Sequence, residues 1–476
     1  MENAKTVLKE TSLSFIENAT DLNDVAYLVK SLIDSGVYDS TIEEAVDARV
    51  LALAPTSSAK DVAYTMSALK NNNEIDYGIY GIGKVGEIGF GVSCLTALEI
   101  PEGFTIGAGY YVKGAPDYAR LYDASGSHMT AIRKHWFKIT GNTFTFHDTQ
   151  VSGSVLPRMF INAGAEVHFV IVDIHTCGIE DGIFVSKPGI DPASAHSAHN
   201  PISQCSNTPS NTYGGLYKAV KSRGENYCLA PVWLYTHLAF MAKAHGDAAT
   251  STAACAFIDV DPKMPKGNNN DALSDVDDTS VTFEASGYSN CALTGSGKPF
   301  AKTTHNGQDC GIADLNGNMW EVASGFIRTD AQGFLILKES VDIRDILTDD
   351  TTQGAGGAYD IDLYDVVDIS DVVSANDGYT YLGNGANQVF AMSTDRNSIA
   401  YKKTALGIPT ATGHSVSGTT EFGNDGVYRY LRNEMACRRG GFWGSVGYAG
   451  LGAMHLYYQR TDSTDYVVGR ASLLVV

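Results

Sequence analysis

Apolar side chains near the amino terminus recur at three- and four-residue intervals, which is the spacing of one face of a helix. The first such face comprises Leu22, Val25, Ala26, Val29, Leu32 and Ile33. Ser40 and Glu43 stand at the spacing of a capping box, so a second helix is expected from Ser40, and it must end before Pro55. A third helix is expected from about Ser58. We therefore predict a helical region over residues 1–75.

The pattern changes after residue 75, where small and apolar residues alternate. The stretches 85–92 and 104–112 place apolar side chains between glycines, which is typical of short strands separated by turns. We therefore predict a small β-rich region over residues 76–128. The glycines from Gly81 to Gly86 are not followed by the Lys-Ser/Thr pair of a phosphate-binding loop, which argues against nucleotide binding there.

From residue 129 onward, strand-like stretches alternate with loops and with two helices. Helices are expected over 213–223, ended by Gly224, and over 231–245, ended by Gly246. Pro231 suits a first helical turn. The second helix would turn one apolar stripe toward the core, made by Trp233, Leu234, Leu238 and Met241. The expected fold class is therefore α+β.

The chain is strongly acidic, with a formal net charge of -20. An acidic chain repels phosphate backbones, so no nucleic-acid partner is expected. Residues 341–371 hold nine Asp and one Arg, within an expected insertion over 341–430. A solvated surface segment is the interpretation we favour for these residues. A cation-binding loop is the alternative, because Asp-x-Asp pairs can supply oxygen ligands.

The cysteines and histidines show no pattern of a metal or redox site. None of the eight cysteines forms a CxxC pair, and no Cys/His spacing fits zinc, so they are expected to be small buried side chains. One disulfide, between Cys291 and Cys310, is left open. His196 and His199 are three residues apart, but prolines flank them, so a helical metal site is disfavoured. We expect neither a metal nor a cofactor.

Two tryptophans lie in segments with strong turn signals. Residues 314–322 read Asp-Leu-Asn-Gly-Asn-Met-Trp-Glu-Val, and the Asn-Gly-Asn within them predicts a tight turn that leads into a strand. Residues 439–443 read Arg-Gly-Gly-Phe-Trp, and Gly-Arg-Ala follows at 469–471.

Together these motifs resemble the formylglycine-generating-enzyme type of C-type lectin fold. Within it they most resemble the variable proteins of diversity-generating retroelements, a family that includes phage tropism determinants and archaeal-virus variable proteins. Segments 132–142 and 293–315 agree with phage-encoded members. The resemblance implies a ligand-binding domain over 129–476, interrupted by the insertion. Residues 1–128 show no resemblance, and the helical part is expected to serve assembly or attachment.

The family implies a fixed backbone frame that carries variable side chains, over a variable region at 439–470. The implied frame comprises Arg439, Gly440, Gly441, Trp443, Ala449, Gly450, Ala453, Leu456, Arg460, Ser463, Gly469 and Arg470. The implied ligand-binding, variable positions are Gly444, Ser445, Val446, Tyr448, Gly452, His455, Tyr457, Tyr458, Asp462, Thr464, Asp465 and Tyr466. Randomising the adenines of an Asn codon cannot produce Met, Trp, Lys, Gln or Glu, and all of these variable positions avoid those five types.

The composition of this segment also favours binding without reference to the family. Residues 442–466 contain no Lys and no Glu but are rich in Tyr, Ser, Gly and Asp, as antibody paratopes are. The alternative is that these tyrosines pack a β-core. Tyr457 and Tyr458 are adjacent and would point to opposite faces of a strand, which argues against that alternative.

Catalysis is not expected, and no catalytic residue is assigned. Enzymes of this fold carry active-site cysteines in the C-terminal segment, whereas this chain has none after Cys437. The first 128 residues contain a single His, His128, so they cannot hold a histidine-rich iron site, and no nucleophile-elbow sequence stands after a clear strand.

The leading hypothesis is a homo-oligomer, with a trimer as the family's usual state, that binds a host cell-surface receptor at a viral tail-fibre tip. The alternatives are a cellular surface-displayed variable protein and, less favoured, an enzyme of this fold. The amino terminus lacks the apolar region of a signal peptide, and no apolar run is long enough for a membrane helix. We therefore expect synthesis in the host cytoplasm, assembly into a virion and no membrane insertion.

Overall fold

The computed structural model of the chain divides it into two units, 1–78 with 95–102, and 79–94 with 103–476. It describes residues 13–16, 40–53, 79–96, 99–258, 280–283, 291–296, 303–346, 359–373, 378–382, 389–415, 421–445 and 448–475.

The first unit contains the helix that the capping box predicts. Helix α3 spans Ser40–Leu53 and stops two residues before Pro55, as expected from the loss of a backbone donor at proline. Ile42 and Val46, four residues apart on one face, are fully buried. The helices expected over 22–33 and from Ser58 lie outside the described residues.

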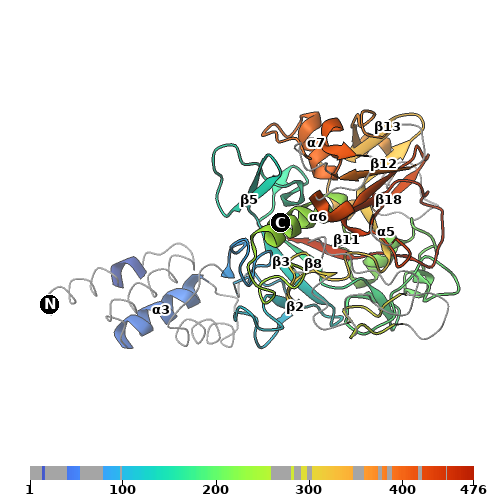
Figure 1. Cartoon of the computed structure of the whole chain (residues 1–476). Helices are drawn as coiled ribbons and strands as arrows, with labels where there is room; N and C mark the ends of the chain where they lie inside the picture. Colours follow the sequence, from blue (N-terminus) through green and yellow to red (C-terminus); the bar gives the residue numbers. More distant parts are fainter. Residues whose placement is uncertain are drawn as a thin grey trace. The chain divides into compact units, whose positions relative to one another are not determined.

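The second unit is mostly β-structure with a few helices, which agrees with a mixed α and β class (Figure 1). One sheet has six strands in the order β1-β2-β3-β8-β21-β11. Its strands are β1 (Thr105–Ile106), β2 (Arg120–Tyr122), β3 (His128–Arg133), β8 (Phe169–Asp173), β21 (Ala471–Val475) and β11 (Tyr227–Leu229). Every residue of β8 is buried, and the C-terminal β21 pairs between β8 and β11. The end of the chain is therefore part of the core.

The second sheet has nine strands and carries the segments with the strongest motifs. Its order is β14-β13-β12-β18-β19-β17-β15-β16, with β20 paired to β12. The bounds are β12 (Trp320–Thr329), β13 (Gly333–Leu337), β14 (Tyr364–Val366), β15 (Gly378–Leu382), β16 (His414–Ser415), β17 (Gly426–Arg429), β18 (Met435–Gly440), β19 (Gly450–His455) and β20 (Val467–Val468). The Asn-Gly-Asn turn does lead into a strand, because β12 begins at Trp320 and Gly317 has a φ of 68°.

Three two-stranded ribbons and several short helices complete the described part of this unit. The ribbons are β4 (Trp136–Thr140) with β5 (Thr143–His147), β6 (Ile161–Asn162) with β7 (Ala165–Glu166), and β9 (Gly178–Glu180) with β10 (Ile183–Val185). Helix α5 spans Leu216–Ala219 and continues as the 3-10 helix η4 (Val220–Arg223), which ends at Gly224 as predicted. Helix α7 spans Ile399–Leu406.

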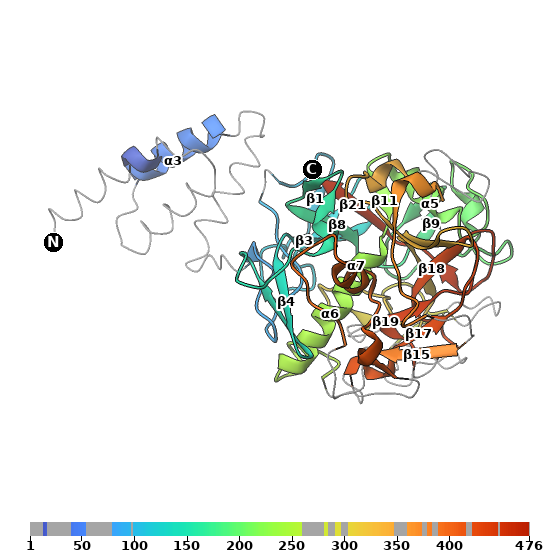
Figure 2. The ribbon, with the colours of Figure 1, turned by 90° about the horizontal axis from the view of Figure 1, so that it is seen from above.

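Helix α6 spans Val232–Ala248 and follows Pro231, as predicted, but runs past Gly246. Trp233, Leu234, Leu238 and Met241 are buried as predicted, but they do not form one stripe, because every residue from Val232 to Gly246 is buried. The helix packs against β5, α7, β12 and β19. Figure 2 shows α7 and β19 beside it. Among the described residues, no helix is both long and apolar enough to cross a membrane.

Two expectations about β-structure need correction. The stretch 85–92 forms turns instead of a strand, because Gly86, Gly89 and Gly91 take left-handed φ angles of 85°, 86° and 88°, which an extended chain does not adopt. Within 104–112 only the two residues of β1 form a strand. Residues 103–128 do not stand apart, since β2 and β3 pair with each other and β3 pairs with β8.

The acidic part, 341–371, is not the fully solvated surface segment that we expected, and the wider segment 341–430 contributes to the core. Strands β14, β15, β16 and β17 come from it and form part of the nine-stranded sheet. Its buried side chains include Tyr359, Tyr364, Val367, Ile369, Phe390, Tyr401, Leu406 and Phe422. Asp345, Asp362, Asp368 and Asp371 are exposed between these apolar residues, whereas Asp425 is buried.

Buried neutral histidines make the stability of this unit depend on pH. Burial lowers the pKa of His135 to about 4 and that of His305 to about 3, although hydrogen bonds with the carbonyls of Arg133 and Gly91 oppose the shift. His305 also accepts a hydrogen bond at Nδ1 from the N–H of Ile312, which a protonated ring cannot do.

We expect the melting temperature to fall as the pH is lowered from about 6.5 toward 4. In the unfolded chain these rings gain protons near pH 6.5, whereas the folded state keeps them neutral, so the stability is complete above that pH and is lost below it. Melting curves at successive pH values measure the effect, and His305→Asn should make the dependence shallower. His168→Gln, on an exposed imidazole, is the control, and a constant melting temperature from pH 7 to 4 would contradict this account.

Candidate binding surface

The predicted frame residues lie inside the second unit. Arg439, Trp443, Ala449, Ala453, Leu456, Arg460 and Arg470 are buried, as are the four frame glycines; Ser463 is exposed. Gly440 and Gly441 have φ angles of 92° and 97°. A Cβ at Gly440 would lie 2.4 Å from the carbonyl oxygen of Leu315, so only glycine fits this turn without a shift of backbone.

Nine of the twelve predicted variable positions are neither fully buried nor fully exposed. These are Gly444, Tyr448, His455, Tyr457, Tyr458, Asp462, Thr464, Asp465 and Tyr466. Val446 lies outside the described residues. The half-exposed positions therefore alternate with buried frame residues along the same segment. Their role in binding a ligand stays a prediction.

Ser445 and Gly452 do not fit a ligand-contacting role. The Ser445 side chain is fully buried, and its Oγ accepts a hydrogen bond of 3.0 Å from the N–H of Phe442. Gly452 is buried against Asp425, whose Oδ2 accepts its N–H at 2.7 Å. A Cβ at Gly452 would meet Leu382 Cδ1 at 2.7 Å, so variation there has little room. Both positions are buried, like most of the predicted frame residues.

The half-exposed aromatic residues form one continuous set of ring contacts, which we call the aromatic surface. It comprises Tyr379, Tyr381, Tyr428, Tyr430, Phe442, Tyr448, His455, Tyr457, Tyr458 and Tyr466. At one end the rings of Tyr448 and Tyr379 are 4.6 Å apart. At the other end the hydroxyls of Tyr458 and Tyr466 are 2.9 Å apart. Five predicted variable residues thus lie on one connected surface.

Strand register places the middle of the aromatic surface in one row across the sheet. Tyr379 on β15 is paired with Tyr428 on β17, which is paired with His455 on β19, which is paired with Arg438 on β18. The rings of Tyr428 and His455 stack at 4.5 Å with an angle of 17° between their planes. Neighbours in such a row contact each other directly, so this arrangement follows from the pairing of the strands.

Sequence reasoning missed the four tyrosines that link the predicted ones. Tyr379 and Tyr381, and likewise Tyr428 and Tyr430, stand two residues apart, and such residues lie on the same face of a strand. Thr380, between Tyr379 and Tyr381, and Val427, next to Tyr428, are buried. The two Tyr-x-Tyr repeats were therefore a usable signal, hidden because the segment was interpreted as an insertion.

The prediction that Tyr457 and Tyr458 point to opposite faces of a strand is wrong. Strand β19 ends at His455, and both tyrosines lie in the loop that follows. Their rings meet at 5.0 Å. The buried guanidinium of Arg438 lies 3.7 Å from the ring centre of Tyr458, and the half-exposed guanidinium of Arg432 lies 4.4 Å from that of Tyr457. These cation–π contacts orient the two rings.

The charge on the aromatic surface is small. Burial and the neighbouring Arg438 hold the pKa of His455 well below its usual value, so its ring is neutral at physiological pH. Asp462 is partly engaged inside the protein, since its Oδ2 accepts the N–H of Gln459 at 2.8 Å. Thr464 contacts the hydroxyl of Tyr213 at 2.9 Å. The surface therefore offers rings, hydroxyls and an imidazole to a ligand.

His196 and His199 do not face a common point. His196 is half-exposed and accepts the N–H of Ala198, whereas His199 is buried and its Nε2 lies 3.1 Å from Oδ1 of Asp191. Burial opposes the charged form of His199, but hydrogen bonds with Asp191 and Cys291 outweigh it and raise its pKa to about 10.

Cys291 and Cys310 are both free thiols, so the disulfide left open between them is not formed.

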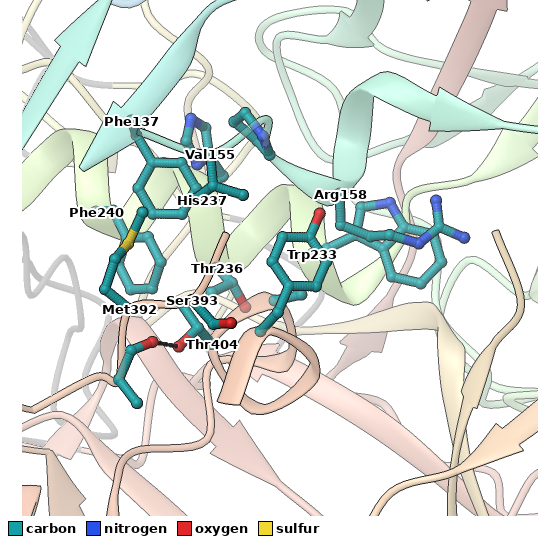
Figure 3. Close-up of a pocket in the computed structure, with 14 residues that line it drawn as sticks. Phe137, Val155, Arg158, Trp233, Thr236, His237, Phe240, Met392, Ser393 and Thr404 are labelled. Atoms are coloured by element: carbon teal, nitrogen blue, oxygen red, sulfur yellow. Dashed lines mark hydrogen bonds between the residues drawn. The ribbon is translucent and has the colours of Figure 1, made fainter. Parts of the chain in front are cut away.

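A small pocket lies beside α6, where Arg158 stacks on Trp233 at 4.3 Å and His237 and Phe240 form the wall (Figure 3). Its volume is about 20 Å³, room for about one water molecule. Pockets that take small-molecule ligands are much larger, so this pocket gives no support to a substrate site.

No protein-family model matches the chain, and no curated protein matches it. Among solved structures the chain is similar to the Major Tropism Determinant U1 variant, at 12% identity and a TM-score of 0.29. It is also similar to the I1 variant of that protein, at 11% identity and a TM-score of 0.28. Each likeness covers 75% of this chain and 66% of the solved chain, so this chain spans less than two thirds of that length. Both likenesses are distant, and the chain's own residues carry the proposal that follows.

Proposed function

We propose that this chain is a variable ligand-binding protein that attaches a virus to its host, with the aromatic surface as its contact site. The second unit is taken to be a C-type lectin fold of the formylglycine-generating-enzyme type, diversified by a retroelement. The protein acts at a tail-fibre tip as a homo-oligomer, with a trimer as the expected state, and binds a cell-surface protein or glycan. It binds and does not catalyse, and it needs no organic cofactor.

One observation carries this proposal: half-exposed aromatic residues form a connected surface on a frame of buried residues. Tyrosine gives a large amphipathic contact area and loses little conformational entropy on binding, which is why it is enriched in paratopes and in interface hot spots. The absence of Lys and Glu from 442–466 also matches the centre of a protein interface. The buried glycines and arginines of the frame keep the backbone in place when exposed side chains change.

Several copies would strengthen attachment. Two or more sites on one assembly convert later contacts into intramolecular events, so avidity can exceed single-site affinity by about 10²–10⁴-fold. A weak and changeable contact at each aromatic surface is then sufficient for firm attachment. This suits a site whose side chains are exchanged frequently.

The DNA around the coding sequence tests the proposal. We expect a reverse-transcriptase gene and a near-copy of the 3' coding end that differs from it at adenines. The differences should fall at the half-exposed positions Gly444, Tyr448, His455, Tyr457, Tyr458, Asp462, Thr464, Asp465 and Tyr466, and should spare Ser445 and Gly452. Virion structural genes nearby would support attachment to a host. A neighbourhood without a reverse transcriptase or a near-copy would overturn diversification.

Tyr457→Ala should weaken attachment to cells. A hot-spot tyrosine contributes about 2 kcal/mol or more to binding. The affinity of the labelled full chain for intact bacterial cells should therefore fall at least about 30-fold. Flow cytometry on a strain that binds the wild-type chain measures the change. Tyr111→Ala is the matched control, because Tyr111 is also half-buried but contacts Tyr80 and Tyr110 instead of the aromatic surface. Equal loss with both variants would exclude the aromatic surface as the specific site.

A further inference from the structure

Three side chains from two segments bring potential metal ligands together next to the variable region. Asp191 and His199 come from one loop, and Cys291 comes from another. One ligand atom from each lies within 4.8 Å of the other two. His199 and Cys291 are buried, whereas the side chain of Asp191 is 29% exposed, so the cluster opens to solvent on the Asp191 side.

The distances within this cluster match a tetrahedral metal site. Nε2 of His199 lies 3.1 Å from Oδ1 of Asp191, and Sγ of Cys291 lies 3.8 Å from Nε2 and 3.9 Å from Oδ1. Usual zinc–ligand bond lengths at tetrahedral angles place nitrogen and oxygen about 3.3 Å apart and sulfur about 3.5 Å from each. Shifts of a few tenths of an ångström therefore allow all three atoms to bind one ion.

The orientation of His199 favours a metal ligand over a catalytic triad. Asp191 and Cys291 both approach the same nitrogen, Nε2, whereas a Cys-His-Asp triad needs the carboxylate on the opposite nitrogen. The opposite nitrogen, Nδ1, lies 3.3 Å from the backbone carbonyl oxygen of Asp465. A carbonyl only accepts, so Nδ1 carries the hydrogen, which is the outer contact that orients metal-binding histidines.

We propose that Asp191, His199 and Cys291 bind one zinc-class divalent transition-metal ion. Nitrogen, thiolate and carboxylate ligands suit Zn²⁺ and its substitute Co²⁺ better than Ca²⁺ or Mg²⁺, which prefer oxygen. Solvent on the Asp191 side completes the four ligands. Because metal ions bind deprotonated ligands, binding should strengthen as the pH rises.

The site would fasten the loop that carries part of the aromatic surface. Asp465, whose carbonyl contacts His199, is next to Tyr466. The N–H of Ala195 donates to the carbonyl of Val467 at 3.2 Å, so the histidine loop already pairs with this segment. Cys291 packs with Trp443 in one core cluster, against which Tyr466 is packed. The metal therefore joins three segments beneath one end of the aromatic surface, and this role goes beyond ligand binding itself.

Titration of the dialysed, full-length chain with Co²⁺ tests the site. We expect one Co²⁺ per chain, with the near-ultraviolet charge-transfer absorption of a cobalt–thiolate bond, which Zn²⁺ then removes. Cys291→Ser should abolish this band, and His199→Gln and Asp191→Asn should weaken Co²⁺ affinity at least about 10-fold. Zn²⁺ should raise the melting temperature of the wild type more than that of Asp191→Asn.

Matched controls come from the same parts of the chain. His196→Gln lies three residues from His199, and Cys205→Ser replaces another buried thiol, so both should keep the band and the affinity. Asp191→Asn changes a partly exposed residue and keeps the thiol, so it remains informative if Cys291→Ser fails to fold. Absence of the band in the wild type, or an undiminished affinity in Asp191→Asn, would overturn the proposal. Neither result bears on the DNA test of the proposed function.

Discussion

Arg470→Met is expected to lower the free energy of unfolding of the second unit by about 3–5 kcal/mol, because it leaves the carboxylate of Glu321 buried without its cation. Both side chains are almost completely buried, at 0% and 1% exposure. Nε of Arg470 donates to Oε2 of Glu321 at 2.9 Å, and Nη2 donates to Oε1 at 3.0 Å. Its remaining N–H groups donate to the backbone carbonyls of Asp173, Ile174 and Ala313, so all five donors are used.

The position of this pair explains the size of the expected effect. Glu321 lies on β12 of the nine-stranded sheet, while Asp173 ends β8 of the six-stranded sheet. Arg470, between β20 and β21, therefore joins the two sheets at the place where the chain passes from one to the other. Tyr235 of α6 donates a further hydrogen bond to Glu321 at 2.9 Å.

Urea unfolding of the purified chain measures the change. Arg396→Met is the matched control, since its ion pair with Glu339 is 40% and 30% exposed and should contribute less than about 1 kcal/mol. The double variant Arg470→Met with Glu321→Met should recover part of the loss, because a buried apolar pair costs less than an unpaired buried charge. If Arg470→Met proved as mild as Arg396→Met, the join between the sheets would not depend on this pair.

Local signals were sufficient to predict where several elements begin or end, whereas the frame was implied by the family resemblance. Pro231 begins α6, Gly224 ends η4, and Asn-Gly-Asn precedes β12, because these residues act through their own backbone preferences. The division that the resemblance implied separated most buried frame residues from half-exposed ones. The prediction for Ser445 and Gly452 failed because their burial depends on contacts with other residues. Ser445 contacts Phe442, and Gly452 contacts Asp425, which is distant in the sequence.

Long-range pairing set the limit of prediction. Nothing local shows that β15 pairs with β17 some fifty residues later, or that β17 then runs parallel to β19, yet these pairings bring Tyr379 and Tyr428 to His455. The acidic composition of 341–371 pointed instead to a solvated segment. In the same way, Cys291 reaches His199 across 92 residues, which no spacing rule for metal ligands covers.

Within one short segment, some side chains point into the core and form the frame, and others point outward and form part of the aromatic surface. Arg438 shows how close the two are, since the guanidinium is buried while Tyr458, which lies over it, is half-exposed. A substitution at Tyr458 changes what a ligand meets and leaves the guanidinium in the core. Variation at the surface is therefore compatible with stability only if the residues beneath carry most of the folding energy.

Trp443→Ala tests that division and should lower the free energy of unfolding by about 3–5 kcal/mol. Trp443 is 5% exposed and packs with Cys291, Met319 and Val468, all nearly inaccessible to solvent. Its backbone N–H donates to the carbonyl of Asn318 at 3.0 Å and would still do so in Trp443→Ala, so the expected loss comes from the packing of the ring. Truncation leaves a cavity that these close-packed neighbours cannot fill.

Tyr457→Ala is the contrasting variant, and its cost should be about 1–2 kcal/mol, because a half-exposed ring loses mainly its contacts with neighbouring rings and with Arg432. Urea unfolding of both variants gives the comparison, and Trp443→Phe, which keeps a ring in the core, should fall between them. Tyr457→Ala should change cell binding more than stability, and Trp443→Ala should do the reverse. Equal destabilisation by Trp443→Ala and Tyr457→Ala would mean that the tyrosine belongs to the core, and the aromatic surface would then lose its standing as a variable contact site.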